Sequence, residues 1–460
     1  MFNYRAFALG KLLTVAPRFL PFADVATPDV PLRRLLRLSL FQVTVGMALS
    51  LLIGTLNRVM IVELSVPATL VAGMLALPLV FAPFRTLIGF RSDTHRSALG
   101  LRRLPYIWKG TLYQFGGFAI MPFALLVLSG YAEAVDAPRW IGLSSAALAF
   151  LLVGAGVHMV QTVGLALATD LVRQEDQPKV VGLMYVMLLL GMLVSALIYG
   201  AMLDPYTPGR LIQVIQGTAV VTIILNMVAM WKQETRDRRR AQAMAVAPDV
   251  AFRAAWTALI ARPGMLRLLC LIGLGTFGFG MADVLLEPYG GQALGFTVGE
   301  TTQLTALFAA GTLAGFGLAS HVLGKGGDPS RLTTLGALLG IPGFAAIILS
   351  STVLGAPLFV AGVFATGLGA GLFGHATLTA TIRSAPKDQI GLFLGAWGAV
   401  QATCAGVAVA LAGIVRDVLM GLNGLAGLSA HMPYNAVFTV EIAFLALAIL
   451  VTIPMTARRS

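Results

Sequence analysis

A histidine with two polar neighbours stands in the middle of a long apolar run. His158, Gln161 and Thr162 lie in GAGVHMVQTVG, at the i, i+3 and i+4 spacing that places three side chains on one helix face. Polar groups that face lipid are costly, so we expect this face to point into a helix bundle. A neutral imidazole there can ligate a metal ion or hydrogen-bond to a neighbouring helix. Chemistry alone favours the hydrogen bond.

A second histidine, His375, lies in the glycine-rich run GLGAGLFGHATLTATIR. Glycines let another helix, or a flat ring, come close to the helix backbone, so both interpretations stay open here as well. In the next apolar run, GAWGAVQATCAGVAVALAG, Trp397 and Gln401 share a helix face. That face offers either a surface for a partner or close packing inside the bundle, and close packing is favoured for any single residue.

Charged residues stand at the ends of two apolar runs. Arg58 lies in GTLNRVMIVEL, and Asp283 and Glu287 lie in GMADVLLEP. We predict that Arg58 pairs with Asp283 or Glu287 and closes one side of the bundle. Independent charges at a membrane surface explain the same residues equally well.

Several chemical signatures are missing from the sequence. No acidic residue is expected near the middle of the first, fourth or seventh apolar run, where proton-coupled transporters usually need a carboxylate. There is no phosphate loop, zinc pattern or nucleophile elbow. Cys270 and Cys404 lie inside apolar runs, which favours packing over a disulfide. We therefore expect neither an enzyme nor a metal site.

The composition indicates a membrane protein. Of the 460 residues 57% are hydrophobic and 11% are charged, against about 25% charged in soluble proteins. A membrane span needs about 20 apolar residues. We predict twelve spans, near residues 37–62, 66–88, 105–129, 140–169, 180–203, 210–231, 265–287, 300–323, 332–352, 357–382, 389–415 and 434–456.

The positive charges predict the topology. If the N-terminus is inside, all but four of the 32 lysines and arginines fall on the inner side, which places both termini in the cytoplasm. The net charge of +12 then reflects topology and attraction to anionic lipid, so a nucleic-acid partner is not expected. The four exceptions are Arg58, Arg139, Arg210 and Arg416.

A weak internal repeat predicts two homologous halves. Gly89-x-x-x-Asp93 follows the second span and Gly324-x-x-x-Asp328 follows the eighth. The predicted fold is an all-α integral membrane protein with two six-helix halves. Its parts are a cytoplasmic segment 1–36, the halves 37–231 and 265–456, a cytoplasmic linker 232–264 and a tail 457–460. The linker ends in an amphipathic stretch, for which a surface helix and a plain linker are equally favoured.

The loop RTLIGFRSDTHRSALGLRRLPYIWKGTLYQFGG at 85–117 resembles the signature loop between the second and third helices of the major facilitator superfamily. The segments GFRSDTHRSALG and RRLPYIW resemble sequences of the narrower PucC/LhaA family, whose members are also called bacteriochlorophyll-delivery proteins. The resemblance covers nearly the whole chain, including PRFLPFAD at 17–24, LLRLSLFQVTVGMA at 35–48 and VGLMYVMLLLGMLVSAL at 181–197. Length and wording favour the PucC branch.

The superfamily resemblance implies twelve helices in two sets of six and a role for this loop. Such loops latch the cytoplasmic side and bias the equilibrium between inward and outward states. The spacer between the aspartate and the second glycine is longer here than in the usual motif. The residues that would carry the latch are Gly89, Asp93, Arg96, Gly100, Arg102 and Arg103.

The family resemblance implies an assembly factor for light-harvesting antennae in the bacterial inner, intracytoplasmic photosynthetic membrane. Its partners would be the antenna α and β polypeptides, with chlorophyll synthase and the reaction-centre antenna complex as further partners. The PucC branch serves the peripheral antenna and the LhaA branch the core antenna. Bacteriochlorophyll would be bound or transported, with His158, Gln161, Thr162 and His375 as candidate pigment-binding residues.

Two alternatives stay open. A transporter of the same fold would move a small solute or a pigment precursor. Its central cavity would be lined by Gln42, His158, Gln161, His375 and Gln401. A purely structural scaffold at the edge of an antenna ring would need no pigment site at all.

Overall fold

Every regular element in the described part of the chain is a helix. The computed structural model describes residues 30–80, 88, 92, 101, 103–130, 136–173, 176–234, 257, 259–353, 355–384, 390–426 and 431–457. Within these ranges, eleven stretches are long and apolar enough to cross a membrane, and a shorter apolar helix follows the first of them. Helices suit a bilayer because they satisfy all backbone hydrogen bonds within one segment.

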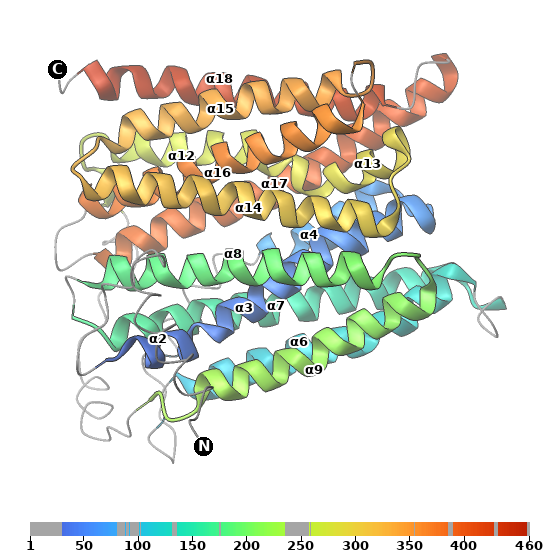
Figure 1. Ribbon diagram of the computed structural model, residues 1–460, viewed down its shortest axis with the longest axis horizontal. Coiled ribbons are helices and arrows are strands. Elements are labelled where there is room, and N and C mark those ends of the chain that lie inside the picture. Colours follow the sequence, from blue (N-terminus) through green and yellow to red (C-terminus); the bar gives the residue numbers. More distant parts are fainter. Residues whose placement is uncertain are drawn as a thin grey trace, which may run out of the picture.

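The first six spans pack together in the lower part of Figure 1. Four consecutive helical pieces form the first span, and two of them are π-helical. The elements are α2 (Leu32–Leu38), α3 (Leu40–Leu49), η2 (Ser50–Leu56), η3 (Val59–Glu63), α4 (Ala68–Val80), α6 (Leu104–Ser129), α7 (Arg139–Asp170), α8 (Gln177–Met202) and α9 (Pro208–Met230).

The remaining spans pack together in the upper part of Figure 1. Their elements are α12 (Met265–Gly280), η6 (Ala282–Val284), α13 (Leu286–Leu294), α14 (Val298–Gly324), α15 (Pro329–Leu349), α16 (Ala356–Ser384), α17 (Ile390–Ala426) and α18 (Met432–Ala457). The observed bounds match most of the predicted spans closely. Residues 1–29 of the predicted segment 1–36 and most of the linker 232–264 lie outside the described residues.

Local signals explain several helix ends. Thr297 and Glu300 form a capping box at the start of α14, each side chain bonding to the other's backbone N–H. Asp328 caps α15 by accepting a hydrogen bond from the Ser330 N–H at 3.0 Å, and Pro329 follows it as the first helical residue. Helix α6 ends at Gly130, whose φ of +60° suits a residue without a side chain.

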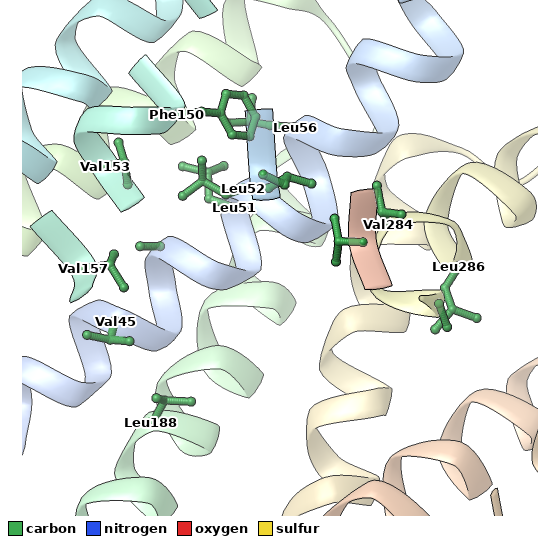
Figure 2. Close-up of a cluster of buried hydrophobic side chains, with 14 of the residues drawn as sticks. Val45, Leu51, Leu52, Leu56, Phe150, Val153, Val157, Leu188, Val284 and Leu286 are labelled. Atoms are coloured by element: carbon green, nitrogen blue, oxygen red, sulfur yellow. The ribbon is translucent and has the colours of Figure 1, made fainter. Parts of the chain in front are cut away.

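Apolar side chains fill the space between the helices. Figure 2 shows Val45, Leu51 and Leu52 of the first span packed towards Phe150 and Val153 of α7. Small residues allow the closest approaches, as is usual where lipid supplies no hydrophobic force between helices. A Cβ added to Gly371 of α16, for example, would collide with the Thr312 carbonyl oxygen of α14.

The two ends of the bundle are distinct. Helix α2 begins and α18 ends at the left side of Figure 1, which we call the terminal face. The other end, where α8 ends and α9 begins, is the opposite face. Under the topology predicted from the charges, the terminal face is cytoplasmic.

Candidate functional site

A cavity of about 310 Å³ lies between the two halves. The first span and α7 contribute its walls from one half, and α12, α14, α16 and α17 contribute them from the other. Five residues singled out from the sequence line this cavity, together with apolar residues and glycines. They are His158, Gln161, Asp283, Trp397 and Gln401.

The other predicted cavity and pigment residues lie elsewhere. His375 is only 6% exposed, and its imidazole packs on the Phe316 ring with the ring centroids 4.1 Å apart, so it faces α14. Gln42 is fully buried within the first half. Neither these two nor Thr162 is among the lining residues. Of the five residues predicted to line a transporter cavity, His158, Gln161 and Gln401 do so, and Gln42 and His375 do not.

Trp397 closes the cavity at its terminal side. Its indole N–H donates to Thr377 Oγ1 at 3.4 Å, and its ring meets Tyr185 of α8 edge-on, with centroids 6.4 Å apart. Trp397 is 5% exposed, so the prediction that it faces a partner protein is wrong. The residue instead joins the two halves, because α17 starts opposite α8.

The seventh span is broken beside the cavity, which the sequence analysis did not predict. Side chains from other spans satisfy the backbone groups that the break frees. The Ala282 N–H donates to Glu441 Oε1 of α18 at 2.6 Å, and Asn57 Nδ2 donates to the Val284 carbonyl at 2.7 Å. The glycines of the apolar segment GTFGFGMAD were the only local feature of the sequence that indicated this break.

Three acidic groups lie in or near this break. Asp283, expected at the outer end of the seventh span, lines the cavity. Glu441 is fully buried in α18, and Glu287 is buried and accepts a hydrogen bond from Thr305 Oγ1. Asp283 is still the second-last residue of the seventh apolar stretch, Met265–Val284, so it lies at the end of the span as predicted. Glu441 was missed, although an acid inside an apolar run was the signal that could have found it.

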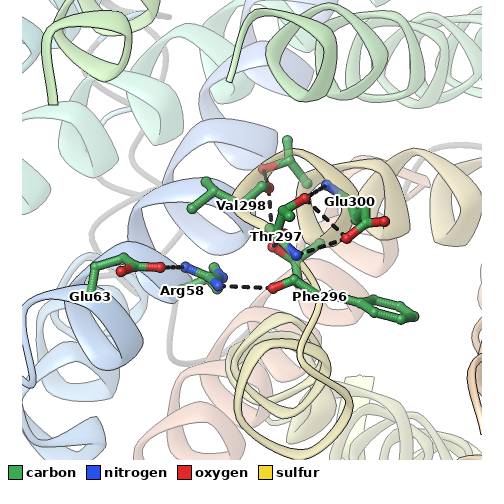
Figure 3. Close-up of polar contacts among 8 residues, drawn as sticks. Arg58, Glu63, Phe296, Thr297, Val298 and Glu300 are labelled. Carbon is green, nitrogen blue, oxygen red and sulfur yellow. Dashed lines mark hydrogen bonds and ion pairs between the residues drawn. The ribbon is translucent and has the colours of Figure 1, made fainter. Parts of the chain in front are cut away.

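Arg58 bonds differently from the prediction. Its guanidinium forms an ion pair with Glu63 of its own span, and its Nη2 donates to the Phe296 carbonyl oxygen of the other half at 3.1 Å (Figure 3). Among the ion pairs of the described residues, none joins Arg58 to Asp283 or Glu287, so the predicted pairing is wrong. The π-helical turns around Arg58 alter which side chains share a face, and this redirects the guanidinium.

A tyrosine lies near this ion pair, in the loop between α8 and α9. Burial, and next the Glu63 carboxylate, raise the pKa of Tyr206 to about 12, while Arg58 opposes them. The phenol therefore stays neutral at physiological pH and adds no charge to the opposite face.

Further contacts join the halves at the opposite face. Thr55 and Thr302 are hydrogen-bonded at 3.2 Å, and the Thr69 N–H donates to Asp417 Oδ2 of α17 at 2.6 Å. All four arginines that the charge analysis placed on this side have partners. Arg139 donates to the Leu64 and Ser65 carbonyls, Arg210 to the Pro205 carbonyl, and Arg416 to Asp417, Gln292 and Tyr434.

Replacing Arg58 by glutamine is expected to destabilise the closed opposite face. The change removes a charge-assisted bond between the halves, which is worth about 2 kcal/mol. Thermal unfolding of the purified protein should show the loss as a lower Tm. Arg210→Gln is the matched control, because the half-buried Arg210 side chain donates to the Pro205 carbonyl of its own half. Equal losses in both variants would argue against the inter-half role of Arg58.

Of the predicted cytoplasmic latch, only Arg103 lies within the described residues. Gly89, Asp93, Arg96, Gly100 and Arg102 lie outside them. The Arg103 side chain is buried and donates through Nε to Asp170 Oδ2 of α7 at 3.1 Å and through Nη1 to Ser92 Oγ at 2.8 Å. Arg103 therefore fastens the start of α6 to the end of α7.

A second acid completes this network. The backbone N–H groups of Arg103 and Leu104 donate to the Glu234 carboxylate, with distances of 2.9 to 3.0 Å. Glu234 thus caps α6 with a negative charge at the positive end of the helix dipole. The sequence analysis identified neither Asp170 nor Glu234 as a partner of Arg103.

The other half has a related fastening at the terminal face. Arg383, at the end of α16, donates to the Gly327 and Leu323 carbonyls at 3.0 Å each. It therefore satisfies carbonyl groups at the end of α14. Asp328 of the second Gly-x-x-x-Asp copy caps the next helix, as described above.

The helices form a multi-pass α-helical membrane protein with the major facilitator fold. A bacterial homologue of the iron transporter ferroportin, in its inward-facing state, matches with a TM-score of 0.66 and 14% identity over 92% of this chain and 98% of that one. The nucleoside transporter NupG matches with a TM-score of 0.68 and 12% identity over 92% and 99%. At these identities the likeness concerns the fold alone.

Sequence comparison gives the family. The profile of the PUCC protein family matches residues 55–460, and the chain belongs to this family. Protein PucC of Rhodobacter capsulatus is 70% identical over 99% of both chains, and Protein PucC of Rhodovulum sulfidophilum is 61% identical over 93% of this chain and 94% of that one. The bacteriochlorophyll synthase 44.5 kDa chain of Rhodobacter capsulatus is 29% identical over 81% and 85%. The PucC-like character that the loop sequences predicted is confirmed.

Proposed function

We propose that this protein is an assembly factor for light-harvesting antenna complexes, which receives bacteriochlorophyll and passes it to antenna α and β polypeptides. The central cavity, in which the His158 imidazole lies among mostly apolar lining residues, carries the proposal. Membership of the PUCC protein family and the printed name of the relative called a bacteriochlorophyll synthase chain support it.

The chemistry of the cavity fits a pigment as cargo. An imidazole such as that of His158 is an axial ligand for the magnesium of a chlorin ring, and Gln161 and Gln401 offer amide donors to ring carbonyl groups. Gly280 and Gly374 also line the cavity, and a Cβ added to Gly374 would meet nothing within 4 Å. The volume of about 310 Å³ is at the lower end for small-molecule pockets, so a whole pigment would extend beyond the cavity.

The chain's own residues would then hold and shield the cargo. His158 would orient the ring from α7, while Trp397 and Tyr185 would cover it from the terminal side. The closed opposite face would exclude water from that end. In this scheme the protein makes and breaks no covalent bond, so it acts as a carrier and not as an enzyme.

The proposed setting is the intracytoplasmic photosynthetic membrane, with both termini in the cytoplasm. Antenna polypeptides are the proposed protein partners, with chlorophyll synthase and the reaction-centre antenna complex as sources or recipients. The peripheral antenna is favoured as the complex that is served, because the curated relatives of highest identity given above are named PucC.

Replacing His158 by alanine is expected to abolish pigment retention. The protein would be purified gently from photosynthetic membranes, and its absorption spectrum and extracted pigment would be measured. Wild type should carry bacteriochlorophyll, and His158→Ala should lose most of it because the axial ligand is gone. His375→Ala is the control, since His375 packs on Phe316 away from the cavity. If only His375→Ala loses the pigment, the axial ligand is His375 and the assignment to His158 is wrong.

Two other results would replace the proposal. A colourless protein that still carries antenna polypeptides would indicate a chaperone without a pigment site. A protein that carries neither would favour the alternative, a transporter of a small solute or pigment precursor. The presence of Asp283 in the cavity is the observation that keeps this alternative open, because transporters of this class use intramembrane carboxylates.

A further inference from the structure

A groove of about 780 Å³ lies on the outside of the first half at the terminal face. It is formed where the first span begins, α6 begins and α9 ends. We call it the Trp108–Trp231 groove. Its lining residues are Arg37, Trp108, Met227, Val228, Met230, Trp231 and Lys232.

The walls of this groove are apolar and aromatic. Trp108 is 38% exposed and Trp231 is 65% exposed, so both indoles present their faces outside the bundle. Exposed tryptophans gather where hydrocarbon meets the headgroups of a bilayer. The methionines beside them are flexible and adapt to irregular apolar ligands.

The charges of the groove all have one sign. Arg37 and Lys232 line it, and no carboxylate is among its described lining residues. The Arg37 Nε is enclosed and has no hydrogen-bond acceptor within the described part of the chain. An enclosed guanidinium N–H without an acceptor is costly, so the site is incomplete without an anion.

We propose that the Trp108–Trp231 groove binds an anionic membrane phospholipid. The phosphate would lie between Arg37 and Lys232, because guanidinium groups match phosphate geometry and an ammonium adds a point charge. An acyl chain would lie along Trp108, Met227 and Trp231. The combination of two cations with an apolar wall at the end of the spans fits an amphiphile better than a free anion.

Native mass spectrometry of the full-length protein in detergent tests this proposal. Phosphatidylglycerol and phosphatidylcholine with identical acyl chains would be titrated separately. Wild type should retain phosphatidylglycerol in preference. Arg37→Gln and Lys232→Gln should each lower that affinity about tenfold, the worth of one charge-assisted contact. Lys232 is exposed, so its variant is expected to fold even if Arg37→Gln does not.

Arg331→Gln is the matched control, because Arg331 is an exposed arginine near the start of α15 in the other half. Equal binding of the two lipids would overturn the proposal, as would an equal loss in the control. Inorganic phosphate at millimolar concentration should not displace the lipid; full displacement would indicate a simple anion site. Phosphatidylglycerol with brominated chains should quench tryptophan emission less in Trp231→Phe than in wild type, and unchanged quenching would contradict the acyl-chain position.

Discussion

Replacing Arg103 by alanine should lower the free energy of unfolding by about 3 kcal/mol, the low end for breaking a buried ion pair. The low end applies because Asp170 is 28% exposed and water can partly solvate it. The change also removes the bond to Ser92, so α6, α7 and the loop before α6 lose their common contact. Thermal unfolding in detergent, followed by helical circular dichroism, measures the effect.

Arg173→Ala is the control for this prediction. Arg173 is 72% exposed and its ion pair with Asp176, at 3.5 Å, lies at the surface, so the loss should be under about 1 kcal/mol. The double variant Arg103→Leu with Asp170→Leu should recover part of the stability, because no unpaired charge remains. If Arg103→Ala unfolds at the wild-type temperature, Arg103 contributes to topology alone.

Replacing Gly299 by valine should separate the halves at the opposite face. A Cβ at Gly299 would lie 2.8 Å from the Gly200 carbonyl oxygen and 3.0 Å from the Asp204 Cβ. The first contact is with backbone, which cannot rotate aside, so α8 and α14 must move apart. The cost of such overpacking is about 2 kcal/mol.

The separation can be measured by cysteine labelling. In a background with Cys270→Ala and Cys404→Ala, Thr302→Cys is buried beside Thr55 and should react slowly with a polar thiol reagent. Adding Gly299→Val should speed the reaction markedly. Gly217→Val is the control, since an added Cβ there meets nothing within 4 Å. Unchanged reactivity in the Gly299 variant would show that the halves adjust without opening.

Much of the fold could be predicted because a membrane leaves few choices. Apolar runs of span length must be helices, and helices such as α6 and α15 begin within a few residues of the predicted positions. The i, i+3 spacing of His158 and Gln161 correctly placed both on one inward face, since α7 is a regular helix up to Asp170. Asp328 of the Gly-x-x-x-Asp repeat caps a helix, a role that the repeat was not used to predict.

The missed features depend on contacts between distant segments. Asp170 and Glu234 reach Arg103 across 67 and 131 residues, and no local pattern announces either partner. Glu441 accepts a hydrogen bond from the Ala282 N–H, which lies 159 residues away in the sequence. Without the Glu441 carboxylate, the Ala282 N–H at the break in the seventh span would have lost its hydrogen-bond acceptor. The break and Glu441 could therefore only be predicted together.

The π-helical turns of the first span have a mechanical consequence. A π turn closes its hydrogen bond at the fifth residue, whereas an α turn closes it at the fourth. Conversion of one π turn within Ser50–Leu56 to an α turn would therefore rotate the residues beyond it by about 100° around the span axis. Asn57 and Arg58, which hold Val284 and Phe296 of the other half, are the next residues in line. Axial rotation of one span, without tilting of a whole half, would thus break both of these contacts between the halves.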